Sequence, residues 1–521
     1  MRNRKLRVLS LLLALAMMIG LFAGCSNNAG GDTKTDDPGK TNEGGTNKSE
    51  GKDSIIIATM SETPSVHPCD HNATAGSYMN QLTYSSLFKS DMELNAVPNL
   101  VDTYENLNET EWQFTLKKGI KFHDGSEMKA EDVKASLEWA KGFPEVSLYN
   151  DDIVKVDVVD DYTFKITTDG PDAILLNNLC HHGNSIVPKA LLDADHDFGK
   201  EPIGSGPYKL IKWNRGDSLE FEAFDDYFGG APAIKHMTWK IIPEGSSRTI
   251  ALEAGEVDFV VEVETMDYER LKSDDGIAVY EYDSTEHNWL MLNNEKPGLD
   301  SEELRHAINC AVDKESIVTV AQNGLAKAAV SQTPYNLPGY SDENSDQYDV
   351  AKAKEWLDQS GVDPASVTLS IICSNDTKKR AGEVIQANLQ EVLGINATIE
   401  SMDLATYLSA TAEGDYTGAI GGYTSSTMVG YLIGVYHSKS IGASNKTRTN
   451  DPEVDALIDK AATTIDETER NKYLEECSAL LNAQCPQIPL YQPTALRAYN
   501  SDLKGVEVNA SGTMYFENLS W

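Results

Sequence analysis

The 521-residue sequence has no long apolar run after Ser54. A membrane-spanning helix needs about 20 consecutive apolar residues, so we do not expect the body of the protein to be embedded in a bilayer. Positive charge is also scarce, because 44 Lys and Arg stand against 81 Asp and Glu and give a formal net charge of −37. An acidic chain without a basic, aromatic-rich stripe is not expected to bind nucleic acid.

Cysteine is rare, and no two cysteines have the CxxC spacing of a structural zinc site. Besides Cys25, the cysteines are scattered singly along the chain, at Cys69, Cys180, Cys310, Cys373, Cys477 and Cys485. We expect most of them to be free, buried thiols and predict no metal centre.

The common hydrolase motifs are missing too. The chain contains neither G-x-S-x-G nor H-E-x-x-H, the patterns of a serine nucleophile elbow and of a zinc protease. Ser86-x-x-Lys89 matches one element of the penicillin-binding serine enzymes, but the S-D-N and K-T-G elements are absent. We therefore predict a protein that is not an enzyme and needs no cofactor.

The N-terminus carries an export signal. Basic residues precede an apolar stretch from Val8 to Phe22, and small residues lead from Phe22 to Cys25. The stretch is too short to span a bilayer, and its end resembles a lipobox, although Phe22 stands where Leu is usual. The pattern predicts a lipoprotein signal peptide at 1–24, with Cys25 acylated.

Residues 25–53 are rich in Gly, Asn, Thr and Asp and contain no aromatic residue. Such a segment cannot bury apolar surface, so we expect a disordered linker. Two acyl chains on Cys25 would anchor the protein stably. The predicted location is extracytoplasmic, on the outer face of the cell membrane.

Strand and helix patterns alternate along the body. The segment 367–399 reads as strand, helix and strand, which favours a parallel crossover. The predicted fold class is α/β (mixed α+β), with two or three domains. The clearest predicted elements are strands at 54–59, 112–116, 153–158, 163–166, 367–373 and 397–399, and helices at 79–87, 130–139, 301–312, 349–359, 381–393, 452–462 and 467–483.

Five separate segments, in order, resemble the family 5 solute-binding proteins of ABC transporters, the group that binds oligopeptides, dipeptides and nickel. The first reads Leu116-x-x-Gly119-Ile-Lys-Phe-His-Asp-Gly125 and is followed by Ala130-x-Asp132-Val133. The others are Gly204-Ser-Gly-Pro-Tyr208, Ala251-Leu-x-x-Gly255-Glu256-x-Asp258, Leu304-Arg305-x-Ala307-Ile308 and Ile488-Pro-Leu-Tyr491. Together they extend over nearly all of residues 54–521.

The resemblance implies a two-lobed periplasmic-binding-protein-like fold with a hinge. Lobe I would cover 54–287, with an extra subdomain inserted at about 85–195, and lobe II would cover 288–494. The chain would return to lobe I at 495–521. The implied function is capture of an oligopeptide or dipeptide between the lobes, and delivery of it by a monomer to the permease and ATPase of an ABC importer.

The resemblance also points to a binding segment in lobe II. Peptide-binding relatives carry an Asp there that pairs with the α-amino group, and the corresponding stretch here runs from Gly421 to Thr427. Gly422, Tyr423, Thr424, Ser425 and Ser426 are the candidate ligand-binding residues of this stretch. Ser426 stands at the Asp position and cannot neutralise a desolvated ammonium, with Asp415 as the nearest alternative anion.

Two further candidate regions complete the predicted site. In the family, pocket-lining residues follow the turn after the first strand, which points to Asn72, Ala73 and Thr74. Arg380 is the best isolated cation for a ligand carboxylate, because a guanidinium can bind it with two hydrogen bonds. The competing interpretation of Arg380 is a solvated Lys-Lys-Arg run.

The ligand class stays open at this point. Because Ser426 is neutral, a non-peptide solute such as an oligosaccharide, a modified amino acid or a metal chelate is the alternative, and a ligand sensor on the same fold is another. The alternative to the predicted lack of a metal centre is a site where His, Cys and Asp crowd together, which needs three or four of them to converge. Those residues are His67, Cys69, Asp70 and His71, with Cys180, His181 and His182 further along.

Overall fold

The computed structural model describes residues 52–521. The predicted signal peptide at 1–24, the predicted lipidation site Cys25 and all but the last two residues of the linker at 25–53 lie outside the described residues.

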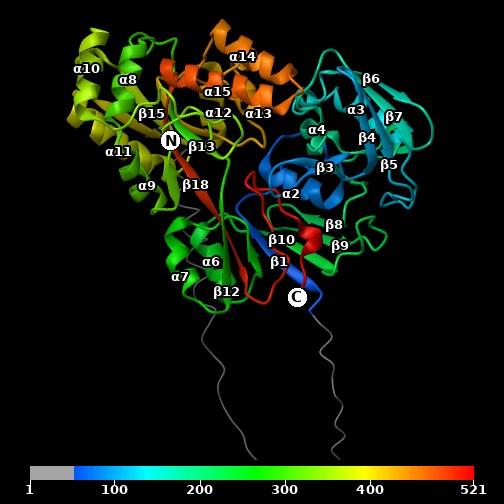
Figure 1. Cartoon of the computed structure of the whole chain (residues 1–521). Coiled ribbons are helices and arrows are strands. Elements are labelled where there is room, and N and C mark those ends of the chain that lie inside the picture. Colours follow the sequence, from blue (N-terminus) through cyan, green and yellow to red (C-terminus); the bar gives the residue numbers. More distant parts are fainter. Residues whose placement is uncertain (1–51) are drawn as a thin grey trace, which may run out of the picture. The chain divides into compact units, whose positions relative to one another are not determined.

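One long strand, β18 (Gln487–Asn500), belongs to both halves of a twelve-stranded sheet. Its first part pairs antiparallel with β13 (His287–Leu292), and its second part pairs antiparallel with β12 (Ile277–Asp283). The change of partner falls between Pro493 and Thr494. The chain therefore crosses between two lobes within β18 and again between β12 and β13 (Figure 1).

In lobe I, β18 is followed across the sheet by β11, β1, β10, β9 and β8. β1 lies parallel to both β10 and β11, so the carboxyl ends of these three strands share one edge of the sheet. The bounds of the elements of this lobe are β1 (Ser54–Thr59), β8 (Tyr208–Asn214), β9 (Ser218–Ala223), β10 (His236–Ile241), β11 (Phe259–Val260), α2 (Thr74–Thr83), α6 (Gly245–Glu253) and α7 (Tyr268–Lys272).

Between α2 and β8 the chain forms a body with its own apolar core, which includes Phe88, Phe114 and Phe164. A four-stranded antiparallel sheet in the order β4-β5-β7-β6 and a two-stranded sheet of β2 and β3 form this inserted body. Its elements are β2 (Phe88–Ser90), β3 (Ala96–Pro98), β4 (Val101–Asn108), β5 (Glu111–Leu116), β6 (Ile153–Val158), β7 (Thr163–Thr168), α3 (Ala130–Ala140), α4 (Leu175–Asn178) and α5 (Lys189–Leu192).

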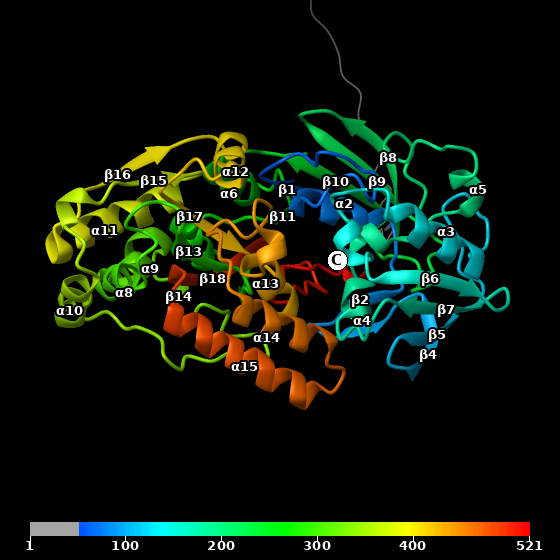
Figure 2. The same cartoon turned by 90° about the horizontal axis from the view of Figure 1, so that it is seen from above.

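In lobe II the sheet continues from β18 through β13, β17, β15 and β16. Helices α8 to α11 bury one face of this sheet and α12 to α15 bury the other, and Figure 2 shows the two groups apart. The bounds are β14 (Ala326–Ala328), β15 (Leu369–Cys373), β16 (Ala397–Ser401), β17 (Gly418–Tyr423), α8 (Glu302–Ala311), α9 (Lys314–Gln322), α10 (Val350–Ser360), α11 (Asp376–Leu393), α12 (Leu404–Glu413), α13 (Met428–Val435), α14 (Pro452–Thr463) and α15 (Glu467–Gln484).

The predicted crossover is confirmed, because β15 and β16 are parallel and α11 joins them. The helix begins five residues before the predicted start at Ala381. Asn375 is the reason, because its side chain accepts a hydrogen bond from the amide of Lys378 and caps the helix. At the other end Gly394 adopts φ 71°, the left-handed conformation of a helix C-cap.

The predicted helix at 79–87 is wrong in position. The helix spans Thr74–Thr83, and Tyr84 is already extended, with φ −120° and ψ 168°. The apolar residues that follow are buried as extended chain, where Ser86 forms a bridge with Ser185. Because these residues are buried on all sides, they are apolar without a strand-like alternation, and the sequence pattern could not distinguish the extended chain from a helix.

None of the helices described within residues 52–521 is long and apolar enough to cross a membrane. The six cysteines of this part of the chain are all unpaired, as predicted, and all but the half-buried Cys180 are buried.

Candidate functional site

The predicted lobe II segment lies at the hinge end of β17. Gly422 is paired with Asn288, and Tyr423 is paired with His287, the first residue of β13. The chain then turns into α13, whose N-cap is Thr427: its hydroxyl accepts a hydrogen bond from the amide of Gly430 at 3.0 Å.

The hydroxyl groups of this turn have different roles. Ser425 bonds locally, donating to the carbonyl of Thr427 at 2.9 Å. Thr424 is exposed and Ser426 is half-buried, and within residues 52–521 no hydrogen bond engages the Ser426 side chain. Ser426 is therefore free to meet a ligand but brings no charge.

The lobe I candidates Asn72, Ala73 and Thr74 lie at the start of α2, where Ala73 is the N-cap. Nδ2 of Asn72 donates to the Tyr149 hydroxyl at 3.2 Å, and Oδ1 of Asn72 lies 3.2 Å from Nε2 of His181. The rings of Tyr149 and His181 stack with centroids 3.6 Å apart. Asn72 is thus held by two aromatic side chains of the inserted body.

Tyr423, the aromatic candidate of lobe II, is half-buried, and its ring packs against Tyr431 of α13 with centroids 6.1 Å apart. Burial, and after it the Tyr149 phenol, raise the pKa of Tyr423. The Tyr423 phenol is therefore uncharged near neutral pH. Sequence reasoning missed Tyr149, because it lies in the inserted body, outside every motif segment.

Arg380 lies apart from this group. Its guanidinium donates to the carbonyl of Ala321 at 3.3 Å and to the Thr377 hydroxyl at 3.1 Å. These contacts tie α11 to the last turn of α9. Within the described chain, no hydrogen bond or ion pair links Arg380 to the other predicted site residues.

His71 and His182 lie close together, but their ring nitrogens already form hydrogen bonds within the protein. The rings of His71 and His182 stack with centroids 5.2 Å apart, and Nε2 of His182 lies 3.2 Å from the carbonyl of His71. Nε2 of His71 is 3.2 Å from the Asn80 amide. Burial lowers the pKa of His182 to about 4. These contacts describe packed, neutral side chains.

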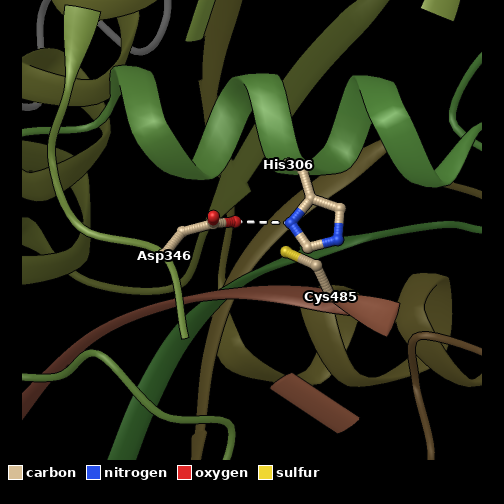
Figure 3. A group of neighbouring side chains, drawn as sticks. All are labelled: His306, Asp346 and Cys485. Carbon is tan, nitrogen blue, oxygen red and sulfur yellow. Dashed lines mark hydrogen bonds and ion pairs between the residues drawn. The ribbon is translucent and has the colours of Figure 1, made fainter. Parts of the chain in front are cut away.

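A different trio, His306, Asp346 and Cys485, has ligand atoms that all lie within 4.8 Å of one another, and it is the one such group found among residues 52–521 (Figure 3). Nδ1 of His306 lies 2.5 Å from Asp346, and Nε2 lies 2.8 Å from the carbonyl of Ala483. Each ring nitrogen of His306 therefore faces an oxygen acceptor, which favours the doubly protonated imidazolium. In that form neither nitrogen has a lone pair to bind a metal.

The electrostatics of this trio agree with an ion pair. Burial raises the pKa of Asp346, but hydrogen bonds from His306 and Lys352 outweigh it and hold the value at about 2. Burial likewise lowers the pKa of His306, yet Asp346 produces a net rise. His306 and Asp346 therefore form a buried ion pair, and Cys485 lies beside it as a neutral thiol, because burial raises the pKa of Cys485 to about 12.

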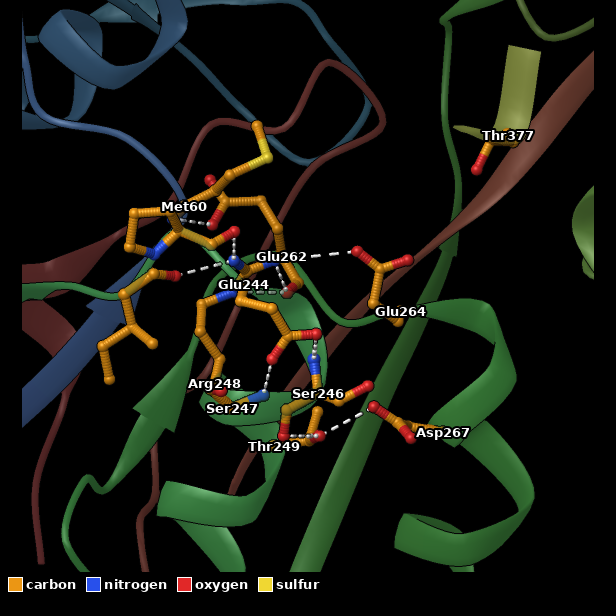
Figure 4. Close-up of polar contacts among 12 residues, drawn as sticks. Met60, Glu244, Ser246, Ser247, Arg248, Thr249, Glu262, Glu264, Asp267 and Thr377 are labelled. Atoms are coloured by element: carbon orange, nitrogen blue, oxygen red, sulfur yellow. Dashed lines mark hydrogen bonds and ion pairs between the residues drawn. The ribbon is translucent and has the colours of Figure 1, made fainter. Parts of the chain in front are cut away.

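The lobe I side of the hinge is rich in carboxylates (Figure 4). Glu262 accepts a hydrogen bond from the amide of Met60 at 2.9 Å, just beyond the end of β1. Glu244 caps α6 by accepting from Ser246 and Ser247. These groups lie at the carboxyl ends of parallel strands, which is where open α/β sheets bind ligands.

Arg248 holds this edge together from inside. It is only 1% exposed and donates to the carbonyls of Ile242, Pro243 and Glu262. The carboxylate of Glu264 lies 4.0 Å from its guanidinium. Arg248 is therefore occupied by the backbone and is not available to a ligand.

Sequence reasoning also missed Glu286, in the short segment between β12 and β13. Its carboxylate accepts a hydrogen bond from the Asn288 amide at 3.1 Å. A Cβ atom on Gly422 would lie 2.6 Å from Oδ1 of Asn288 and 3.2 Å from the Glu286 carboxylate. Glycine at 422 thus leaves room for both side chains beside the predicted binding segment.

Two α/β lobes joined by crossing strands define the two-lobed fold of a periplasmic binding protein. The chain belongs to the bacterial extracellular solute-binding proteins of family 5. The family model described as "Bacterial extracellular solute-binding proteins, family 5 Middle" matches residues 95–442.

Relatives of known name cover almost the whole chain. The glutathione-binding protein GsiB of Pectobacterium atrosepticum is 28% identical over 483 residues, which span 89% of this chain and 93% of that protein. The probable D,D-dipeptide-binding periplasmic protein DdpA of Escherichia coli is 28% identical over 487 residues, 88% of this chain and 92% of that protein.

A solved structure shares the fold. The ABC transporter-associated periplasmic binding protein DppA from Helicobacter pylori, in complex with the peptide STSA, matches with a TM-score of 0.80 and 24% identity. The match covers 90% of this chain and 98% of that chain.

Proposed function

We propose that this protein captures an oligopeptide or a dipeptide between its lobes and delivers it to the permease and ATPase of an ABC importer. The observation that carries the proposal is that the candidate segment of lobe II lies at the hinge end of β17, while a hydrogen bond from Ala173 to Ala462 holds the inserted body of lobe I against lobe II. Ligand capture between lobes needs groups from both, and these come from the predicted segments. The relatives named for glutathione and for D,D-dipeptides favour a peptide.

The proposed ligand-binding residues are Asn72, Ala73, Thr74, Gly422, Tyr423, Thr424, Ser425 and Ser426, whereas Arg380, the predicted cation for a ligand carboxylate, lies apart from them on α11. We place the lobes at 54–287 and 288–494, with the return at 495–521 and the inserted subdomain at about 85–195. The change of partner along β18 supports the second crossing point.

The protein would work as a lipid-anchored monomer without enzymatic activity. The lipobox ending at Cys25 supports an anchor at the outer face of the cell membrane, and the Gly-rich linker up to residue 53 supports a tether. Metabolic labelling with a radioactive fatty acid tests the anchor, since Cys25→Ser should abolish the label.

A non-peptide solute is the second candidate, and Ser426 is the observation that favours it. A hydroxyl group cannot balance a buried ammonium, whereas it serves well in binding a sugar or a neutral solute.

Native mass spectrometry of the purified full-length protein separates the two candidates. The bound species would be released by denaturation and identified. A series of peptide masses is expected. A single sugar-like or metal-containing mass would contradict peptide capture and favour the second candidate.

A further inference from the structure

Glu286 occupies an unusual place in the hinge. It lies in the segment that carries the chain from β12 to β13, and its amide donates to the Ser284 hydroxyl at 3.0 Å, which shapes the turn. Its side chain is half-buried. Within residues 52–521 no Lys, Arg or His nitrogen lies within ion-pair distance of its carboxylate, so its charge lacks a direct partner in the protein.

The carboxylate faces the predicted binding segment. Glu286 and Asn288 lie two residues apart and point to the same side of the sheet, the side on which Gly422 has no side chain. Gly422 is exposed, and its missing Cβ would lie 3.2 Å from a Glu286 oxygen. The charge of Glu286 therefore lies directly beside the backbone of the segment 421–427.

The groups around Glu286 come from three elements. Its charge raises the pKa values of Tyr282 on β12 and Tyr491 on β18, in each case after burial. Lys378, in the first turn of α11, has its pKa lowered by burial, and Glu286 opposes that shift. One cation and two phenols thus share the neighbourhood of an unpaired carboxylate.

The other carboxylates near the site are unsuited to a ligand ammonium. Glu244 and Glu262 already accept hydrogen bonds from backbone amides. Asp415 precedes β17 at the end where Gly418 pairs with Leu292, whereas the hinge end carries Tyr423. Asp415 therefore cannot replace the acid that Ser426 lacks, which corrects its place as the alternative anion.

We propose that Glu286 holds the free amino group of the ligand. This inference rests on the proposed function and narrows its substrate class to peptides with an unblocked amino terminus. A carboxylate can accept charge-assisted hydrogen bonds from an ammonium, and the hinge would withdraw both groups from water when the lobes close. The acid is thus supplied by the crossing segment instead of by the turn before α13.

A set of synthetic tri- and tetrapeptides without lysine, and the same set N-acetylated, tests this with the full-length protein. Isothermal titration calorimetry with the free-amino peptide that wild-type protein binds most tightly should show that Glu286→Gln raises the Kd about 30-fold or more. Wild-type protein should reject the acetylated set. Glu475→Gln, an exposed acid on α15, is the matched control and should bind as wild type does.

The outcomes are distinguishable. Wild-type protein that binds neither set would overturn the proposed function together with this inference. If wild type binds both sets equally, or if Glu286→Gln binds free-amino peptides as wild type does, the function stands and Glu286 is only a neighbour of Lys378. Glu286→Asp retains the charge, so it should keep the preference for free amines even if Glu286→Gln folds poorly.

Discussion

The amide of Ala173 donates a hydrogen bond of 2.8 Å to the carbonyl of Ala462, although the two residues belong to different lobes. Ala462 lies in the last turn of α14, and Ala173 lies in the inserted body just before α4. The next residue, Ile174, packs against the apolar core of lobe II, as does Leu94. The inserted body therefore contacts lobe II through both backbone and apolar side chains.

Ile174→Ala should weaken ligand binding without a comparable loss of stability. The contact with lobe II exists only while the lobes are together, so its loss disfavours the closed form that holds the ligand. Partial burial of three carbon atoms stabilises by about 1 kcal/mol, or about a fivefold change in Kd by titration. Ile250→Ala is the control, since Ile250 is 58% exposed. Equal affinities of Ile174→Ala and wild type would contradict a role in closure.

The free energy of unfolding should depend on pH through the buried pair His306–Asp346. Asp346 has its pKa lowered from 3.8 to about 2, so its contribution is present above pH 4 and is lost as pH falls towards 2. His306 has its pKa raised above 6.5, so its contribution is complete below pH 6.5 and is lost as pH rises through the raised value. Urea titrations between pH 2 and 8 measure the free energy of unfolding across both losses, the acidic one from Asp346 and the one at higher pH from His306.

Asp346→Asn should reduce the pH dependence at both the acidic and the neutral end and lower the free energy of unfolding at pH 5 by about 3 kcal/mol, because it leaves the buried His306 cation without its partner. Asp358→Asn, an exposed change on α10, is the control and should retain the wild-type pH dependence. A variant Asp346→Asn with the wild-type profile would show that other groups cause it.

Gly422→Ala should disturb the hinge end of β17. The added Cβ would come within 2.6 Å of Asn288 and must displace it or the strand, a crowding that costs about 1–3 kcal/mol. Gly170→Ala is a matched control, because a Cβ there has no neighbour within 4 Å. Thermal unfolding compares the two variants, and similar melting temperatures would contradict the crowding.

Ser426→Asp should improve the binding of free-amino peptides by about tenfold. The half-buried side chain precedes α13 in the predicted binding segment, and a carboxylate there would add an attraction for an ammonium that the hydroxyl lacks. Competition between free and N-acetylated peptides measures the change. Unaltered discrimination would mean that Ser426 does not face the amino group.

Much of the fold follows from local sequence. Ser301 and Asp349 begin helices as caps, and Gly361 and Gly394 end them in the left-handed conformation. The misplaced helix at 79–87 failed because apolar residues buried as extended chain carry no period that separates strand from helix. The length of β18 could not be predicted either, because its continuous apolar stretch covers only Ile488 to Tyr491.

The candidate site was harder to predict than the fold. Its two segments were found by resemblance, but Tyr149 and Glu286 come from a body and a crossing segment that no motif marks. They come to lie beside the candidate segments through contacts between residues far apart in the chain, such as Asn72 with Tyr149. Asp415 shows the opposite case. It is close to Tyr423 in the sequence, but the length of β17 separates the two residues in the structure.

The position of β18 also governs when the protein can fold. It lies between β13 and β11 in the middle of the strand order, yet it is the last strand to leave the ribosome. Neither lobe can complete its sheet until residue 500 has been synthesised, because both await the same segment. A nascent chain therefore remains unfinished in both lobes until residue 500 has emerged from the ribosome.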